Sequence, residues 1–507
     1  MVTLNGESLT LEQVAAVARG GEEVEIDAQA ARRMRASREQ VERMAEGEAP
    51  VYAVNTGVGY LAETRISAGE LALLQENVVR SHACGVGDPL PREVVRAMML
   101  IRANVLAKGL SGIRPVVARR LCSLLNRGVT PVVPSRGSVG ASGDLAPLAH
   151  MALVLLGEGE AEYQGQRMDG AKALEAAGIT PLNLRAKEGI SLVNGTQAML
   201  GMGALALLDI EDLCEMADVA CALSTDALRG TPRAFDRRIH EARPHPGQMA
   251  SARLLERLME GSEIRESHRT CRHVQDAYSL RCAPQVHGAV RDAAAEARRI
   301  FSIELNSATD NPLVFDGEIL SGGNFHGQPL ALALDGLAVA LCSLAGISER
   351  RIDRMVNPML NEGLPAFLAQ HPGLESGLMM WQVAAAALVA ELRVLAAPAS
   401  TGSITTSGNK EDFVSMGMTS ALKLWEGVKM ARMVLAIEMM AASQAIEFLR
   451  PLRTSPALEA FLELLREQVP VQKKDSPASG AMEKVSRWLA GWRSLPKPWG
   501  GVQVEKT

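Results

Sequence analysis

Apolar residues recur at helical spacing along most of this chain. Positions three and four residues apart on one face predict amphipathic α-helices. The longer predicted helices cover residues 70–83, 91–109, 114–127, 190–227, 284–306, 327–347, 376–397 and 413–446. The pattern therefore predicts a mainly α fold, with a small α/β-containing N-terminal part and then a bundle of long helices.

Polar segments interrupt this pattern in three places, at residues 128–145, 396–412 and 470–480. The first is dense in Gly, Pro and Ser yet lies between predicted helices, so it is either a linker or a functional loop. An earlier stretch, VYAVNTGVGYLA at residues 51–62, begins with β-favouring residues and becomes a glycine-punctuated loop.

The chain is long enough and apolar enough to bury a large core. It has 507 residues, of which 47% are hydrophobic, and the length suggests about three domain-sized units. We expect an N-terminal domain at 1–200, a central bundle at 201–450 and a C-terminal helical segment at 451–507. The net charge of −5 gives no electrostatic case for a nucleic-acid or anionic-membrane partner.

The cysteines and the apolar runs predict a soluble cytoplasmic protein. None of the cysteines forms a CxxC pair, which argues against a zinc site or a disulfide framework. The first residues lack the features of a signal peptide. The most apolar run, Leu330–Gly346, is interrupted by Asp335 and does not reach the length of a membrane span. No HExxH motif occurs among the nine histidines, so no metal is expected. The cysteines are Cys84, Cys122, Cys214, Cys221, Cys271, Cys282 and Cys342.

The segment GSVGASGDLAPLAH at residues 137–150 carries distinctive chemistry. Gly143 has no side chain, so its backbone nitrogen can approach the Ala141 carbonyl carbon closely. Attack there with loss of water closes a five-membered ring. Loss of the Ser142 hydroxyl as a second water leaves an exocyclic methylene, and Asp144 could position the groups that leave. The product is an electrophile that captures an amine and helps it to leave while a base removes a β-proton.

Other interpretations of this segment exist. Ala-Ser-Gly occurs in many ordinary turns. A serine hydrolase is a further alternative, but its nucleophile elbow reads G-x-S-x-G, and here Asp144 stands two residues after Ser142.

Several separated motifs follow one another in the order found in the histidine/phenylalanine/tyrosine ammonia-lyase family. The chain resembles this family over almost its whole length. The motifs are YAVNTGVG (52–59), ENVVRSHACGVGDPL (76–90), GSVGASGDLAPLAH (137–150), SLVNGTQA (191–198), VQDAYSLRCAPQVHG (274–288), NSATDNPL (306–313), SGGNFHGQPLA (321–331) and NKEDFVSMG (409–417).

The resemblance implies a prosthetic group and a set of site residues. Ala141, Ser142 and Gly143 would form 4-methylidene-imidazol-5-one. The resemblance implies that Tyr52 is a base or proton shuttle, that Arg281 pairs with the substrate carboxylate, and that Asn194 hydrogen-bonds near the amine or the ring oxygen. Glu411 would be an acid, a base or an anchor for the side chain. Tyr278 and Gln275 would line the pocket, and Phe325 would pack against the ring or the substrate. The resemblance also implies a fold of the ammonia-lyase/fumarase superhelical type and a homotetramer whose active sites each combine three chains.

Each of these residues also has a structural alternative. Tyr52 could be an ordinary strand residue, Arg281 part of an ion pair, and Asn194 a helix cap. Phe325 could belong to the core. Glu411 could be an acidic residue in the first turn of the following helix.

The pair Ser81-His82 points to histidine as the substrate, giving trans-urocanate and ammonia. Histidine lyases of this family typically carry Ser-His here, and a phenyl ring would leave polar His82 and Glu411 unpaired. His82 could instead cap or pack locally. The C-terminal segment 441–456 also resembles the histidine branch. Four positions depart from that branch: Val58, Phe413, the pair Leu392-Arg393, and Trp381.

These departures keep a phenylalanine or tyrosine lyase, or a 2,3-aminomutase on the same scaffold, as alternatives. Two other classes are a fumarase/aspartase-type lyase, whose serine-loop motif GSSxMPxKxNP does not occur in this chain, and a non-catalytic helical scaffold.

Overall fold

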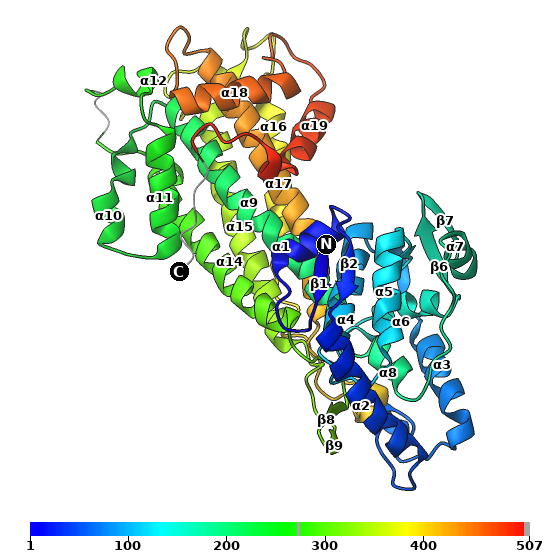
Figure 1. Cartoon of the computed structure of the whole chain (residues 1–507). Helices are drawn as coiled ribbons and strands as arrows, with labels where there is room; N and C mark the ends of the chain where they lie inside the picture. Colours follow the sequence, from blue (N-terminus) through cyan, green and yellow to red (C-terminus); the bar gives the residue numbers. More distant parts are fainter. Residues whose placement is uncertain (271–273, 501–507) are drawn as a thin grey trace. The chain divides into compact units, whose positions relative to one another are not determined.

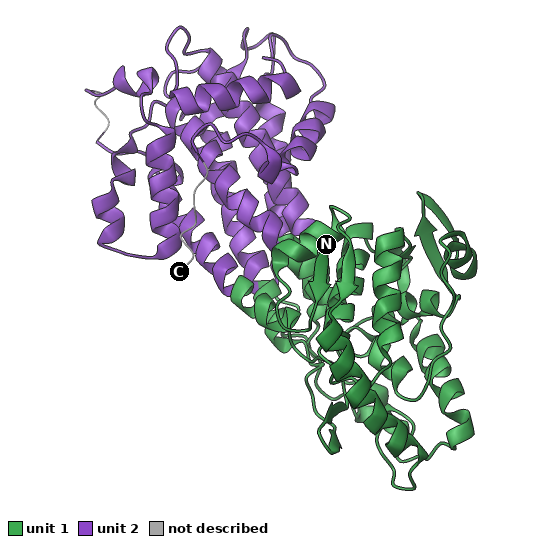
Figure 2. Ribbon diagram, in the orientation of Figure 1, with its two compact units in different colours: residues 1–206, 297–335, 398–425 green, residues 207–296, 336–397, 426–507 purple. Residues whose placement is uncertain are grey.

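The computed structural model describes residues 1–270 and 274–500, and Cys271 lies outside them. The described chain is mainly helical (Figure 1), as predicted. It divides into two compact units, each built from three separated segments: residues 1–206, 297–335 and 398–425 form unit 1, and residues 207–296, 336–397 and 426–507 form unit 2 (Figure 2).

Unit 1 combines helices with short strands. Its elements are β1 (Val2–Leu4), α1 (Leu11–Ala18), β2 (Val24–Ile26), α2 (Ala28–Glu46), α3 (Leu71–His82), β3 (Val86–Pro89), α4 (Arg92–Ala107), α5 (Pro115–Arg127), β4 (Thr130–Pro131), β5 (Pro134–Arg136), α6 (Leu145–Leu155), β6 (Glu160–Tyr163), β7 (Gln166–Asp169), α7 (Gly170–Ala176), α8 (Glu188–Val193), β8 (Leu313–Phe315) and β9 (Glu318–Leu320).

The strands of unit 1 make small sheets. Strands β1 and β2 pair in parallel, and the antiparallel sheets have the orders β3-β5, β4-β6-β7 and β8-β9. Local sequence fixes several helix ends. Thr10 and Gln13 form a capping box at the start of α1, Asp27 caps α2, and α5 runs from Pro115 to a left-handed Gly128.

Unit 2 contains helices and loops but no strand among its described residues. Its own helices are α10 (Arg237–Glu241), α11 (Pro246–Leu258), α12 (Glu263–Glu266), α13 (Tyr278–Arg281), α16 (Met379–Leu395), α18 (Pro456–Gln468) and α19 (Ser479–Leu489). Four longer helices have residues in both units: α9 (Gln197–Ala227), α14 (Ala283–Leu305), α15 (Gln328–Val356) and α17 (Gly417–Glu447).

A buried charged network joins these four helices within unit 2. Arg351 donates to both carboxylate oxygens of Glu438, at 2.9 Å for Nη2 to Oε2. Arg351 also lies 3.3 Å from His287 Nε2, and His287 Nδ1 lies 2.7 Å from Asp218, which Arg291 also contacts. Because Arg351 can only donate, His287 is neutral and carries its hydrogen on Nδ1. Burial also lowers the pKa of His287, which favours the neutral ring.

Two segments differ from the sequence prediction. The helix expected at 190–227 is interrupted between α8 and α9, where Gly195 has a φ of +149°. Residues 52–55 form a turn in place of the β-like start, with one isolated bridge from Thr56 to Arg65, and Ala53 has a φ of +57°. In both cases tertiary contacts override local preference.

Helix α15 is the one helix among the described residues that is long and apolar enough to cross a membrane, and half of its most apolar window is buried within the protein. Asp335 does not interrupt it, because its carboxylate is held by the Ser400 N–H at 2.8 Å and by Lys423 at 3.5 Å.

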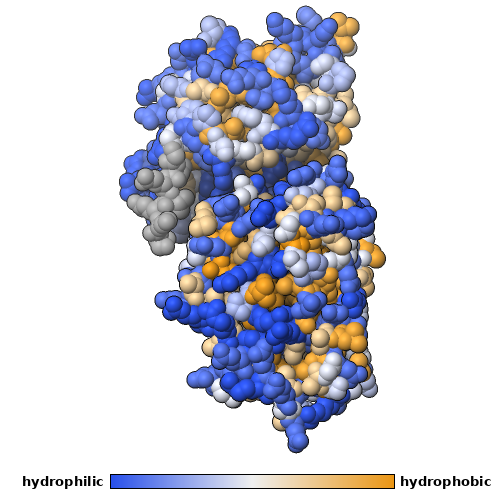
Figure 3. Space-filling model, turned by 45° about the vertical axis from the view of Figure 1, so that its right-hand side comes forward, coloured by the Kyte–Doolittle hydropathy of each residue, from blue (hydrophilic) through white to orange (hydrophobic). Residues whose placement is uncertain are grey.

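Other apolar side chains remain on the surface, and one face of the molecule shows gathered apolar patches (Figure 3). Exposed examples on α14, α15 and α16 are Ile303, Leu332, Val339, Met380, Val383 and Val394.

Candidate active site

The Ala-Ser-Gly turn lies directly before α6 and is held by close backbone contacts. Gly143 has a φ of +72°, a left-handed conformation that favours glycine. A Cβ on Gly143 would lie 2.1 Å from the Gly195 carbonyl oxygen. Only a residue without a side chain fits at this position.

The break between α8 and α9 forms the other side of this contact. The Asp144 N–H donates to the Gly195 carbonyl at 2.7 Å, and the Gly195 N–H donates to the Ser142 carbonyl at 3.2 Å. Gly195 therefore leaves the helical conformation in order to pair with the turn.

Asp144 fixes the turn to the beginning of α9. Its Oδ2 accepts the N–H groups of Ala198 and Met199, both at 2.9 Å. Ser138 Oγ lies 3.2 Å from Asp144 Oδ1 and 3.3 Å from the Gly143 carbonyl oxygen. Complete burial raises the pKa of Asp144 to about 7, against the lowering effect of these hydrogen bonds. The carboxyl group thus exchanges protons near neutral pH.

Glu411 faces the serine of the turn. Its Oε1 accepts from Ser142 Oγ at 3.3 Å, and its Oε2 accepts from Thr406 Oγ1 at 2.8 Å. Glu411 does not belong to the first turn of a helix, because α17 begins only at Gly417.

Three glycines allow close packing of further segments around the turn and around the start of α9. A Cβ on Gly140 would lie 2.2 Å from Ser415 Oγ, and a Cβ on Gly327 or Gly417 would lie 2.5 Å from the Met199 sulfur. The Met416 N–H also donates to the Val139 carbonyl at 2.9 Å.

Asn194 ends α8 beside this contact. Its Nδ2 donates to the Asn311 carbonyl at 3.2 Å, while its buried Oδ1 has no hydrogen-bond partner within the described part of the chain. A buried acceptor without a donor is costly, so this oxygen suits a donor supplied by a bound molecule.

Tyr52 lies in a loop next to the Glu411 loop. Its hydroxyl accepts from the Gly59 N–H at 3.2 Å. A Cβ on Gly59 would lie 3.4 Å from Ser407 Oγ, and one on Gly408 would lie 3.3 Å from the Tyr60 ring. Tyr52 does not lie in a strand.

Ser81 and His82 end α3. His82 Nδ1 lies 2.7 Å from the Val78 carbonyl and 3.1 Å from Ser81 Oγ. Because a carbonyl only accepts, Nδ1 carries a hydrogen, and in the neutral ring Nε2 is left as a free acceptor. The chain that follows pairs β3 with β5, which leads into the Ala-Ser-Gly turn.

The remaining expected residues lie in two places. Phe325 is half-buried in unit 1, and the next residue, His326, stacks on Phe413 with ring centroids 6.1 Å apart. Gln275, Tyr278 and Arg281 belong to unit 2. There the Arg281 guanidinium lies 4.6 Å from the centroid of the Tyr278 ring, which is 71% exposed.

The structure thus brings Ser142, Gly143, Asn194 and Glu411 together in unit 1. It also adds residues that the sequence analysis missed, above all Gly195, and Arg102, which donates to the Asn194 carbonyl at 2.8 Å. The Asn-Gly pair in SLVNGTQA was a signal for Gly195. The single charge inside the apolar run AMMLIRANVLA was a signal for Arg102. No group of three or more His, Cys, Asp or Glu side chains suited to a metal ion occurs among residues 1–270 and 274–500.

Comparison with known proteins matches these features to one family. The family model for aromatic amino acid lyases matches residues 9–467. A histidine ammonia-lyase of Koribacter versatilis is 57% identical over 486 residues, covering 93% of this chain and 94% of that protein. One from Myxococcus xanthus is 54% identical, with 96% of each chain covered.

Solved structures agree with the sequence comparison. Histidine ammonia-lyase from Trypanosoma cruzi has a TM-score of 0.91 at 40% identity, covering 99% of this chain and 96% of that one. Tyrosine aminomutase from Streptomyces globisporus has a TM-score of 0.93 at 40% identity, covering 97% of each. This chain belongs to the aromatic amino acid lyase family.

Proposed function

We propose that the protein eliminates ammonia from L-histidine to give trans-urocanate, with an electrophilic 4-methylidene-imidazol-5-one formed from Ala141, Ser142 and Gly143. The observation that carries the proposal is the turn itself, in which Gly143 is packed on Gly195 and the Ser142 hydroxyl faces the Glu411 carboxylate. The names of the most similar relatives support histidine as substrate.

The residues present fit this group. Ring closure joins the Gly143 nitrogen to the Ala141 carbonyl carbon and releases water, and Ser142 then loses its hydroxyl and α-hydrogen as a second water. Glu411, 3.3 Å from the Ser142 hydroxyl, is placed to pass a proton to the leaving oxygen. Asp144 and Ser138 hold the Gly143 peptide. The Ser142 carbonyl becomes the ring carbonyl, and its oxygen already accepts from the Gly195 N–H. Such donors stabilise negative charge that develops on oxygen.

The ring would supply an electrophile that makes the substrate amine a good leaving group. Asn194 Oδ1, the buried acceptor without a partner, would receive a hydrogen from that amine. Tyr52 would act as the base or proton shuttle for the β-proton, and Glu411 would carry protons on the ring side. Phe325 would pack against the ring or the imidazole.

We propose that the complete site combines chains of a homotetramer. Arg281 would pair its planar guanidinium with the substrate carboxylate, and Tyr278 and Gln275 would line the same pocket. The exposure of Tyr278 and the exposed apolar residues on α14, α15 and α16 support a surface that another copy covers. The described cysteines are free thiols, in keeping with a cytoplasmic enzyme.

Substrate choice is the first testable point. With L-histidine, L-phenylalanine and L-tyrosine assayed side by side, we expect urocanate from histidine as the main product, with kcat/KM at least about a hundredfold above the other two, because an aromatic carbon ring offers no hydrogen bond to the half-buried His82 ring. An arylacrylate as main product would contradict the proposal that histidine is the substrate. A β-amino acid would instead identify a 2,3-aminomutase, the alternative that the structural likeness to tyrosine aminomutase favours.

His82 is expected to select the imidazole, because its free Nε2 can accept the substrate N–H. We expect His82→Leu to lower kcat/KM for histidine about ten- to a hundredfold, mostly through KM, as for one lost buried hydrogen bond. Steady-state kinetics measures this.

The chain provides a matched control in unit 2. His268 follows a serine at the end of α12, with Nδ1 2.6 Å from Ser267 Oγ and 3.4 Å from the Ile264 carbonyl, the same local arrangement as at His82. His268→Leu should leave histidine turnover unchanged. Equal kcat/KM for the two variants would show that His82 does not contribute to substrate recognition.

A further inference from the structure

Arg102 is a fully buried arginine in the middle of apolar helix α4. Its Nη1 donates to the Asn194 carbonyl at 2.8 Å and to Gln197 Oε1 at 3.0 Å, and its Nη2 donates to the Ser191 carbonyl. Gln197 Nε2 in turn donates to Thr309 Oγ1 at 2.8 Å. The guanidinium therefore spans the break between α8 and α9.

The peptide group between Asn194 and Gly195 links Arg102 to the Ala-Ser-Gly turn. In a trans peptide the carbonyl and the N–H point in opposite directions. The Asn194 carbonyl accepts from Arg102, and the Gly195 N–H on the other side of the same plane donates to the Ser142 carbonyl. Hydrogen bonds in such a chain polarise one another, most strongly when one donor is charged.

The glycine in this chain is packed directly on the guanidinium. A Cβ on Gly195 would lie 2.7 Å from Arg102 Nη1 and 2.5 Å from Gln197 Oε1. On the opposite side, a Cβ on Gly143 would meet the Gly195 carbonyl oxygen. Arg102, Gly195 and Gly143 thus form a continuous stack, in which a shift of the guanidinium displaces the turn.

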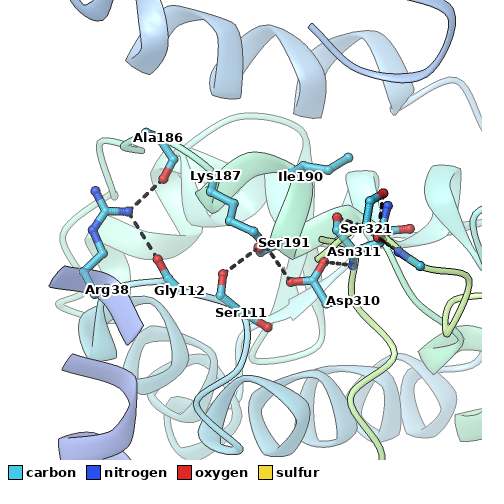
Figure 4. Close-up of polar contacts among 12 residues, drawn as sticks. Arg38, Ser111, Gly112, Ala186, Lys187, Ile190, Ser191, Asp310, Asn311 and Ser321 are labelled. Atoms are coloured by element: carbon cyan, nitrogen blue, oxygen red, sulfur yellow. Dashed lines mark hydrogen bonds and ion pairs between the residues drawn. The ribbon is translucent and has the colours of Figure 1, made fainter. Parts of the chain in front are cut away.

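Figure 4 shows a second buried polar cluster, around Lys187, Ser191 and Asp310. Lys187 Nζ lies 3.3 Å from Asp310 Oδ2 and 2.9 Å from Ser191 Oγ, and both charged side chains are fully buried. Asp310 also attracts Arg102 electrostatically. The neighbouring Asn311 carbonyl accepts from Asn194 Nδ2. Arg102 therefore holds the backbone carbonyl of Asn194, and Asn311 holds its side chain.

We propose that Arg102 is a positioning residue for the electrophile. It orients the Asn194–Gly195 peptide so that the Gly195 N–H faces the oxygen of Ser142, and it transmits its positive charge through that peptide to the same oxygen. The inference rests on the proposed function, in which this oxygen becomes the ring carbonyl. Arg102 has two effects: it assists ring closure by holding the turn, and it raises turnover by stabilising charge on the ring oxygen.

Arg96 provides a matched control on the same helix. It is also buried, and its guanidinium donates to three backbone carbonyls, those of Ala18, Leu125 and Val17, where that of Arg102 donates to two carbonyls and to Gln197 Oε1. None of these carbonyls belongs to the site. Arg96→Met therefore removes a buried arginine from α4 without changing the peptide at Gly195.

The test compares wild type, Arg102→Met, Arg102→Lys and Arg96→Met, purified as full-length proteins at a temperature where they remain folded. The mass of the proteolytic peptide that carries residues 141–143 reports ring formation, since the ring lacks two waters. Kinetics with L-histidine, corrected for the fraction of ring-containing protein, reports turnover. For Arg102→Met we expect incomplete loss of the two waters, and a kcat about ten- to a hundredfold lower with KM within about twofold, as for a weakened oxyanion donor.

The other variants complete the expected pattern. Arg102→Lys should lie between wild type and Arg102→Met, because an ammonium keeps the charge without the planar fork. Arg96→Met should form the ring completely and keep the kcat of wild type, even with a lower melting temperature. If Arg102→Met does not fold, Arg102→Lys decides in its place.

Two results would overturn the proposal. One is complete ring formation in Arg102→Met with a kcat within about twofold of Arg96→Met. The other concerns the case in which Arg102→Met does not fold. The proposal then fails if Arg102→Lys has the same kcat and the same peptide mass as wild type. A wild-type peptide of unmodified mass would instead refute the proposed function, whatever the variants do.

Discussion

Replacing Ser142 by Ala is expected to abolish ammonia elimination, with a loss of at least about four orders of magnitude in kcat. Alanine has no hydroxyl to lose, so no methylene forms and no electrophile is available to the amine. The fold should be unaffected, because within residues 1–270 and 274–500 the hydroxyl makes one hydrogen bond, to Glu411 at 3.3 Å.

Activity and mass together test this expectation. The wild-type peptide should lack two waters, and the Ser142→Ala peptide should lack one at most. Ser123→Ala is a suitable control, because its hydroxyl only contacts the Arg119 carbonyl within helix α5. Turnover by Ser142→Ala at the rate of wild type would refute an electrophile formed at this position.

Replacing Lys187 by Met is expected to lower the free energy of unfolding by about 3–5 kcal/mol. Lys187 and Asp310 are both fully buried, and removal of the cation leaves the Asp310 carboxylate without its ion-pair partner. Lys187 and Arg102 hold the pKa of Asp310 below its ordinary value against the opposing effect of burial. Without Lys187, that carboxylate must be buried with less compensation or take up a proton.

Thermal and urea unfolding of the full-length protein measure the loss. The double variant Lys187→Met with Asp310→Leu should recover part of the stability, since neither member of the ion pair is then buried without the other. The exposed pair Lys172–Asp169, with nitrogen and oxygen 3.0 Å apart and side chains more than 65% exposed, is the control. Lys172→Met should have no measurable effect. Equal tolerance of the two lysine substitutions would contradict the expected role of the buried pair.

Helical periodicity predicted most of the fold because most helices bury one apolar face. The expected segment 284–306 became Ala283–Leu305, and 91–109 became Arg92–Ala107. Periodicity failed at Gly195, because its conformation is set by hydrogen bonds to a turn some fifty residues earlier in the chain, at Ser142 and Asp144. Apolar spacing carries no information on such a contact. The domain boundaries at residues 200 and 450 stay a prediction.

The candidate site, like the fold, could be predicted from the sequence only in part. The chemistry of Ala141, Ser142 and Gly143 could be inferred from side-chain size and from the serine hydroxyl. Motif resemblance indicated Glu411 and Asn194, and the structure places Glu411 against Ser142. Arg102 could not be assigned, because its partners are mainly backbone carbonyls, and a sequence does not report which carbonyls lie in reach of a buried guanidinium.

The contact between Gly143 and Gly195 has a practical consequence for enzyme engineering. At both positions an added methyl group would overlap backbone or buried polar atoms, so mutant libraries gain nothing from varying them. Residues such as His82 and Phe413 make their contacts through side chains. Catalysts with new substrate scope should therefore be sought at these side chains, with the two glycines held constant.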